Sequence, residues 1–211
     1  HYGTGKTEVS VNLALALAAE GEQVMLADLD IVNPYFRSRE RRPLLEKAGV
    51  RVISSSQACS DADVPALPAE LLTILENREI RGILDIGGDP VGARVLARVQ
   101  PKIVQEDYQL IFVLNANRPE VRDAESAAAY LRSIEAVTGL TCSGLVNNTH
   151  LCGETTPAEI RKGAALAQEV SRQTGIPILC HTAERRFLES LSDLGEPVFP
   201  IAINMKKPWE R

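Results

Sequence analysis

The sequence predicts an α/β fold with a single doubly wound, mostly parallel sheet and helices on both of its faces. Short apolar runs alternate with longer amphipathic segments, and residues that favour turns bound most of the runs. The runs are apolar at nearly every position, which is typical of parallel strands buried on both faces. We expect strands over residues 23–27, 50–54, 82–86, 110–114, 142–147 and 176–180.

The segments between these runs predict the helices, because their apolar residues recur every three or four positions. Several of them begin with Pro near the first turn, where a helix tolerates the missing N–H. The segment 55–68 is rich in Ser, Asp and Pro and predicts a loop at the carboxyl end of a strand, where doubly wound sheets bind ligands. We expect helices over residues 6–20, 35–47, 68–78, 91–99, 119–137 and 157–174.

Composition and charge narrow the class of protein. The 211 residues are 45% hydrophobic and 24% charged, and no linker or repeat divides them, so we expect one globular domain over residues 1–211. The net charge of -5 argues against wholesale nucleic-acid binding. No apolar run reaches the roughly 18 residues of a membrane span, so we expect a cytoplasmic protein without a membrane anchor. The cysteines form no C-x-x-C pair and are expected as reduced thiols: Cys59, Cys142, Cys152 and Cys180.

The start of the chain carries the strongest motif. Gly3-Thr4-Gly5-Lys6-Thr7 leads directly into an amphipathic helix and matches the end of the P-loop pattern G-x-x-x-x-G-K-[ST]. In that pattern backbone amides surround phosphate oxygens, the Lys neutralises the outer phosphates and the Thr hydroxyl joins the Mg²⁺ shell. We therefore expect nucleotide contacts from the loop and the first helical turn: Gly3, Thr4, Gly5, Lys6, Thr7 and Glu8.

The pattern's first glycine would fall one residue before His1. The strand that precedes a P-loop is a central member of such a sheet. We expect this first strand, missing from the sequence in hand, to lie in an upstream segment.

Two acidic strand ends follow the P-loop in the order that phosphoryl chemistry requires. Asp28-Leu29-Asp30 ends the expected strand 23–27, where a carboxylate can position water for attack on a γ-phosphate. Ile83-Leu84-Asp85-Ile86-Gly87-Gly88 resembles a Walker B element, whose Asp holds Mg²⁺ through water. We therefore expect Asp30 and Lys6 to be catalytic, and Thr7 and Asp85 to hold Mg²⁺.

Asparagines close two later strands, at Asn115 to Asn117 and at Asn147 to Asn148. An Asn side chain offers donors and acceptors that can read a purine edge, although it also forms turns. Neither segment contains the Asn-Lys-x-Asp arrangement by which many GTPases select guanine, so we favour ATP over GTP.

The P-loop, the Asp-x-Asp strand end and the Asp-x-Gly-Gly segment, in this order, resemble the MinD/ParA-like ATPases, grouped with the CobQ/CobB nucleotide-binding domains. The resemblance covers almost the whole chain. It implies a Mg-ATP-dependent hydrolase that acts as a switch on a protein client and often dimerises when ATP is bound. It also implies that Asp30 supports hydrolysis, that Asp85 is the Mg-associated Asp and that Asn147 contacts adenine.

The chain departs from this family at one position. Members with the deviant P-loop carry a second lysine five residues before Lys6, where this sequence has His1. We hypothesise that Arg37 or Arg39 supplies the missing charge, because arginine can stabilise a γ-phosphate in cis or in trans. The alternative is that both are solvated arginines of a helix surface.

Two other functions fit the same motifs. One is a small-molecule kinase or ATP-dependent synthetase of the dethiobiotin/cobyrinate type, with an acceptor pocket at residues 55–68 and 87–89. The other is a nucleotide-binding module that hydrolyses nothing. The P-loop and the carboxylates serve either phosphoryl reaction, since catalysis rests mainly on positioning and charge.

Overall fold

The computed structural model describes residues 3–30, 37–54 and 70–205. The chain divides into two compact units, each of which contains its own sheet. The first unit comprises His1–Lys6 and Leu96–Ile203, and the second comprises Thr7–Val95 and Asn204–Arg211. The strands of both sheets are parallel and helices pack against them, so the α/β class predicted from the sequence is confirmed.

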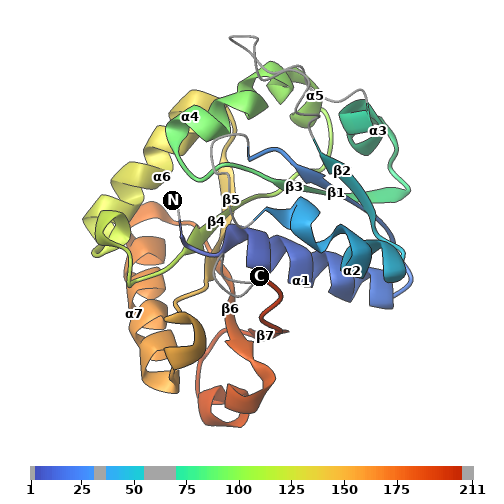
Figure 1. The fold of residues 1–211 in the computed structure, drawn as a ribbon. Coiled ribbons are helices and arrows are strands. Elements are labelled where there is room, and N and C mark those ends of the chain that lie inside the picture. Colours follow the sequence, from blue (N-terminus) through green and yellow to red (C-terminus); the bar gives the residue numbers. More distant parts are fainter. Residues whose placement is uncertain (1–2, 31–36, 55–69, 206–211) are drawn as a thin grey trace. The chain divides into compact units, whose positions relative to one another are not determined.

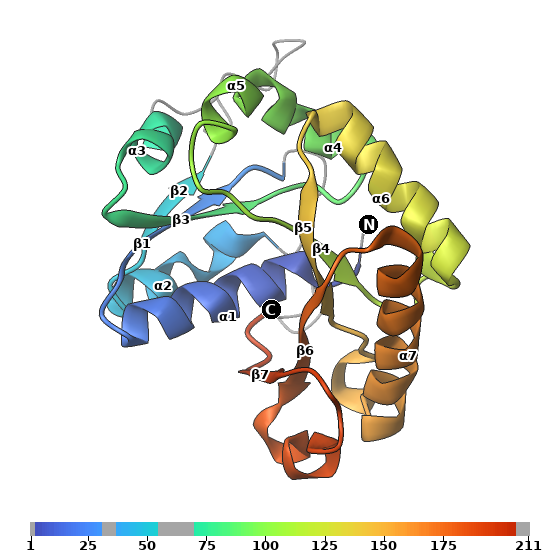
Figure 2. The same cartoon turned by 180° about the vertical axis from the view of Figure 1, so that it is seen from behind.

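The second unit contains a three-stranded sheet in the order β2-β1-β3. Its strands are β1 (Gln23–Asp28), β2 (Arg51–Ser54) and β3 (Ile80–Asp85). Helices α1 (Lys6–Ala19) and α2 (Arg42–Lys47) cover one face with an aliphatic core, and α3 (Glu70–Glu76) covers the other (Figures 1 and 2). The short α4 (Pro90–Ala93) follows β3, with the Asp89 side chain as its N-cap.

The first unit contains a four-stranded sheet in the order β4-β5-β6-β7. Its strands are β4 (Leu110–Leu114), β5 (Cys142–Asn147), β6 (Ile178–Glu184) and β7 (Val198–Ile201). The long helices α6 (Ala124–Thr138) and α7 (Pro157–Thr174) lie side by side against this sheet, and α5 (Gln100–Ile103) precedes β4 (Figure 1). Both long helices end at a glycine in the left-handed conformation, which closes the last turn without a Cβ clash.

Strand β7 is the strand, and the short helix α5 the helix, that the sequence patterns do not predict. Strand β7 contains Pro200, which has no N–H for the ladder and is tolerated because β7 is the edge strand of its sheet. Strand β6 continues beyond the expected range 176–180 through the polar residues His181, Thr182 and Glu184. An apolar run does not predict this polar part of the strand. The six strands expected from the sequence divide equally between two sheets, where one sheet was expected, and β7 is the remaining strand of the four-stranded sheet.

Several predicted helices are shorter than their amphipathic segments. Residues 91–99 divide into α4 and a 3₁₀ turn (Arg94–Arg98), and residues 119–137 begin with a 3₁₀ turn (Pro119–Val121) before α6. A 3₁₀ turn (Ser38–Arg41) likewise precedes α2. The loop predicted at residues 55–68 lies outside the described residues. None of the helices that the structure describes has the length and apolarity needed to cross a bilayer.

Candidate functional site

The loop Gly3 to Lys6 has two glycines in the left-handed region of the backbone map. Gly3 and Gly5 have φ angles of 74° and 79°, a region that side chains other than glycine seldom adopt. Thr4 between them is fully buried, and helix α1 begins at Lys6. Successive residues of this kind turn their N–H groups toward one side, where they can surround an anion.

Side chains from the ends of two strands hold the carbonyl groups of this loop. Arg118 Nε donates to the Gly3 oxygen at 2.7 Å, and Asn148 Nδ2 donates to the Thr4 oxygen at 2.7 Å. A trans peptide places its C=O and N–H on opposite sides. The Thr4 N–H therefore points away from Arg118, and the Gly5 N–H points away from Asn148.

Both glycines of the loop are sterically required. A Cβ on Gly3 would lie 2.7 Å from Arg118 Cζ. A Cβ on Gly5 would overlap Asn148 Nδ2 and lie 3.2 Å from His150 Nε2. The close approach of Arg118 and Asn148 to the backbone depends on the absence of these Cβ atoms.

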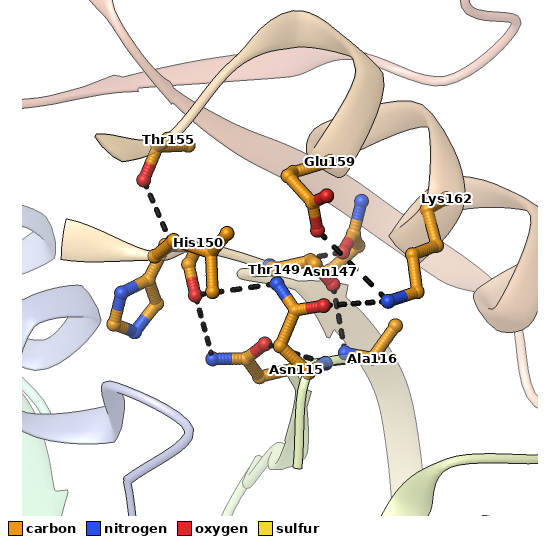
Figure 3. Close-up of polar contacts among 10 residues, drawn as sticks. Asn115, Ala116, Asn147, Thr149, His150, Thr155, Glu159 and Lys162 are labelled. Carbon is orange, nitrogen blue, oxygen red and sulfur yellow. Dashed lines mark hydrogen bonds and ion pairs between the residues drawn. The ribbon is translucent and has the colours of Figure 1, made fainter. Parts of the chain in front are cut away.

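A polar network joins the ends of β4 and β5 (Figure 3). Asn115 Nδ2 donates to the His150 oxygen at 3.4 Å, and the Ala116 N–H donates to Thr149 Oγ1 at 3.0 Å. At the exposed end of this network, Lys162 Nζ donates to Asn117 Oδ1 at 2.7 Å. Burial and the positive charge of Arg118 lower the pKa of His150, which favours a neutral imidazole beside the loop.

Asn147, predicted to contact adenine, lies in the interior of the first unit. Its residue is 0% exposed, and Nδ2 donates to the Ile160 oxygen at 3.0 Å while Oδ1 accepts from the Thr149 N–H at 3.1 Å. Nδ2 also lies 3.1 Å from Nδ1 of the buried His181. These contacts favour a structural role for the Asn147 side chain.

The second unit places two carboxylates at neighbouring strand ends. Asp28 and Asp85 are paired in the register of β1 and β3, and each residue is 2% exposed. Burial raises the pKa of Asp28, against the opposing effect of the Arg39 N–H and guanidinium. Asp30 follows β1, and its Oδ1 lies 3.3 Å from the position that a Cβ on Gly87 would take. The two acidic segments singled out in the sequence therefore meet in this unit.

Arg39, one of two arginines considered as a substitute for the absent lysine, is engaged with Asp28. Its backbone N–H donates to Asp28 Oδ2 at 3.3 Å and its Nε lies 3.9 Å from the same oxygen. Arg37 lies immediately before the 3₁₀ turn that carries Arg39. His1 lies outside the described residues.

The Glu8 side chain has a role that the motif does not predict. Its carboxylate accepts the backbone N–H groups of Asn204 and Met205, at 2.8 Å and 3.0 Å. Burial raises the pKa of Glu8, against the lowering effect of these bonds. The backbone N–H of Glu8, in the first turn of α1, remains the group suited to a phosphate. Lys6 and Thr7 are half-buried in the same turn.

Comparison with known proteins gives a family and a fold. A model of the CobQ/CobB/MinD/ParA nucleotide binding domain matches residues 3–198. Among curated proteins, no relative matches the chain at a significant level.

Two solved structures show the same fold. Cell division protein FtsY from Thermotoga maritima is 20% identical, with a TM-score of 0.58, over 86% of this chain and 58% of its own. The signal recognition particle receptor FtsY from Elizabethkingia anophelis is 18% identical, with a TM-score of 0.52, over 84% of this chain and 54% of its own. The chain thus spans a little over half the length of each FtsY chain, and the likeness establishes a P-loop α/β fold.

Proposed function

Because the chain belongs to the family of CobQ/CobB/MinD/ParA nucleotide-binding domains, we propose that it is a Mg-dependent ATPase that acts as a switch on a protein client. The observation that carries the proposal is the loop at Gly3 to Lys6. It has two positive-φ glycines directly before helix α1, and side chains of distant residues hold two of its carbonyls. This arrangement suits a phosphate chain.

In this proposal the loop and the first turn of α1 bind the phosphates. The N–H groups of Thr4 and Gly5, together with those of the first helical turn, donate to phosphate oxygens. Lys6 adds a positive charge for the outer phosphates, as in other P-loops. The backbone of Glu8 contributes its N–H, because its carboxylate is occupied by the segment at Asn204 and Met205.

The oxygen donors suit Mg²⁺. Within residues 3–30, 37–54 and 70–205, no group of three or more His, Cys, Asp or Glu side chains could hold a metal ion by itself. Mg²⁺ commonly takes one or two protein oxygens together with waters and phosphates, and the Thr7 hydroxyl and the Asp85 carboxylate, the latter through water, provide that set. When bound, the ion supplies positive charge to the phosphates. The chain's own contribution is to keep the Asp85 carboxylate buried in a defined position beside Asp28.

Asp30 is the residue that we assign to hydrolysis. It lies two residues after the buried end of β1, and a Cβ on Gly87 would crowd its carboxylate. A carboxylate in this place can orient a water molecule and accept its proton. The preference for ATP rests on the sequence at the end of β5, Asn147-Asn148-Thr149-His150, which differs from the Asn-Lys-x-Asp of guanine-selective proteins.

The first experiment measures nucleotide binding and turnover by the full-length natural chain. We expect slow Mg-dependent ATP hydrolysis that Lys6→Ala and Asp30→Ala each abolish, and weaker hydrolysis of GTP. Binding without turnover would contradict the ATPase and support a non-hydrolysing module. Phosphoryl transfer to a small molecule in place of water would support the kinase or synthetase.

The second experiment tests the switch. Light scattering gives the solution mass in Mg-ADP and then in Mg with a non-hydrolysable ATP analogue. Doubling of the mass only with the analogue would support a nucleotide-dependent homodimer.

A third experiment replaces Arg37 and Arg39 with alanine. It tests whether these arginines provide the positive charge of the lysine that His1 replaces, and unchanged hydrolysis would refute that role.

A further inference from the structure

Asn148 is a buried side chain with two defined contacts. It lies directly after β5, is 2% exposed, and donates from Nδ2 to the Thr4 oxygen at 2.7 Å. Its Oδ1 accepts the hydroxyl hydrogen of Thr182, a residue of β6 that is 3% exposed. All three residues belong to the first unit.

The Thr4 carbonyl, which can only accept, determines which way the Asn148 amide faces, and the Thr182 hydroxyl holds the amide there by donating to Oδ1. The two ends of a carboxamide have almost the same shape, so its orientation follows from its hydrogen-bond partners. With Nδ2 donating to the Thr4 carbonyl, Oδ1 is the end that accepts the Thr182 hydroxyl hydrogen. The reversed amide would place Oδ1 against the Thr4 oxygen, where neither atom can donate.

The geometry points to Thr182 as a positioning residue that acts through Asn148 on the phosphate-binding loop. Thr182 itself bonds Asn148 and, more weakly, the Asn147 oxygen at 3.4 Å. Its effect on a ligand therefore passes through the Thr4 carbonyl, whose orientation sets the direction of the Gly5 N–H. This inference rests on the proposed nucleotide binding.

Loss of the Thr182 hydroxyl would disturb the loop because Asn148 has little freedom to adapt. Its Oδ1 would become a buried acceptor without its short hydrogen bond, which is costly in an apolar interior. Its Nδ2 fills the space beside Gly5 that a Cβ would occupy, so any rotation of the amide moves an atom packed against the loop.

The test compares Thr182→Val with Thr182→Ser. Valine keeps the shape of threonine without the hydroxyl, and serine keeps the hydroxyl. Affinity for Mg-ADP and for Mg with a non-hydrolysable ATP analogue is measured by titration calorimetry on the full-length chain. We expect Thr182→Val to weaken binding about tenfold, as for a buried hydrogen bond lost at a site, and Thr182→Ser to restore it.

Thr138→Val is the matched control. Thr138 is also buried in the first unit, at 1% exposure, but its hydroxyl bonds the Ile134 oxygen at the end of α6. We expect this variant to lose stability without losing affinity. An equal loss of affinity in both variants would show a general structural effect. It would overturn the proposed positioning role of Thr182.

A double-mutant cycle tests the route through Asn148. If Thr182 acts through Asn148, Thr182→Val should have no further effect on affinity in an Asn148→Ala background. Additive losses would overturn that route. If the wild type binds nucleotide and Thr182→Val binds it with the same affinity, only the positioning role of Thr182 is overturned. If the wild type binds no nucleotide, the proposed function is overturned, and the positioning role with it.

Discussion

Asp28 and Asp85 end adjacent parallel strands at paired positions, and both residues are 2% exposed. Burial removes hydration from the charged form of Asp28, and the negative charge of Asp30 adds a smaller repulsion. Arg39 offsets part of this cost by an N–H bond and an ion pair to Asp28. The remaining penalty raises the pKa of Asp28 and gives folding a defined dependence on pH.

Asp28→Asn should remove the part of the pH dependence of the unfolding free energy that Asp28 causes. Because the folded-state pKa of Asp28 is raised above its ordinary value of 3.8, its neutral form is favoured by folding. The associated stability is present below pH 3.8 and is lost as the pH rises through the folded-state pKa. We therefore expect the unfolding free energy of Asp28→Asn, relative to wild type, to increase between pH 4 and pH 7 in urea titrations. A constant difference would contradict this assignment.

Gly5→Ala should abolish nucleotide binding, whereas Gly21→Ala should not. Both glycines have positive φ, so each alanine carries a backbone cost of about 1–2 kcal/mol. Only at Gly5 would the new Cβ also meet Asn148, because nothing lies within 4 Å of a Cβ at Gly21. Calorimetric binding and thermal unfolding of the two variants separate the shared backbone cost from the clash. Normal binding by Gly5→Ala would contradict the loop geometry.

Gly163→Ala should destabilise the protein although alanine is the better helix former. Gly163 lies inside α7, where a Cβ would overlap Thr149 Oγ1 and Asn147 Oδ1. Overpacking of this kind costs about 1–3 kcal/mol, more than the gain of about 1 kcal/mol in helix propensity. Urea unfolding measures the net effect.

The exposed position Ala165 in the same helix is the control for Gly163→Ala. Ala165→Gly should cost about 1 kcal/mol through propensity alone. Opposite substitutions two residues apart should therefore both destabilise α7. An increase in stability on Gly163→Ala would show that α7 does not pack closely on the end of β5.

Cys152 should react with iodoacetamide well before Cys142 and Cys180. Cys152 is exposed, Cys142 is buried and Cys180 is half-buried. Burial raises the pKa of Cys142 to about 11 and also raises that of Cys180, and only the thiolate is a strong nucleophile. Peptide mass spectrometry of the native protein at pH 8 gives the labelling rates of the three cysteines. In the urea-unfolded protein these three rates should become similar. Faster labelling of Cys142 than of Cys152 would contradict the burial described.

The class of the fold and the centre of the site follow from local patterns in the sequence. Short apolar runs indicated six strands and period-3.6 hydrophobicity indicated the main helices, because these signals depend on neighbours within one element. The Gly-Lys-Thr segment indicated the phosphate-binding loop, since its chemistry lies in consecutive residues. The acidic ends of β1 and β3 were equally visible, and their pairing follows from adjacent parallel strands.

Only the tertiary structure decided which distant side chains support that loop. Arg118 and Asn148 reach Gly3 and Thr4 across more than a hundred residues of sequence, and no local pattern distinguishes them from other turn residues. The same holds for Asn147, whose amide is buried and bonded internally, and for Glu8, whose carboxylate is bonded to the segment at Asn204. The sequence determined which segment carries the P-loop motif, and the packing of strand ends determined which side chains hold that segment, because hydrogen-bond partners depend on proximity in space.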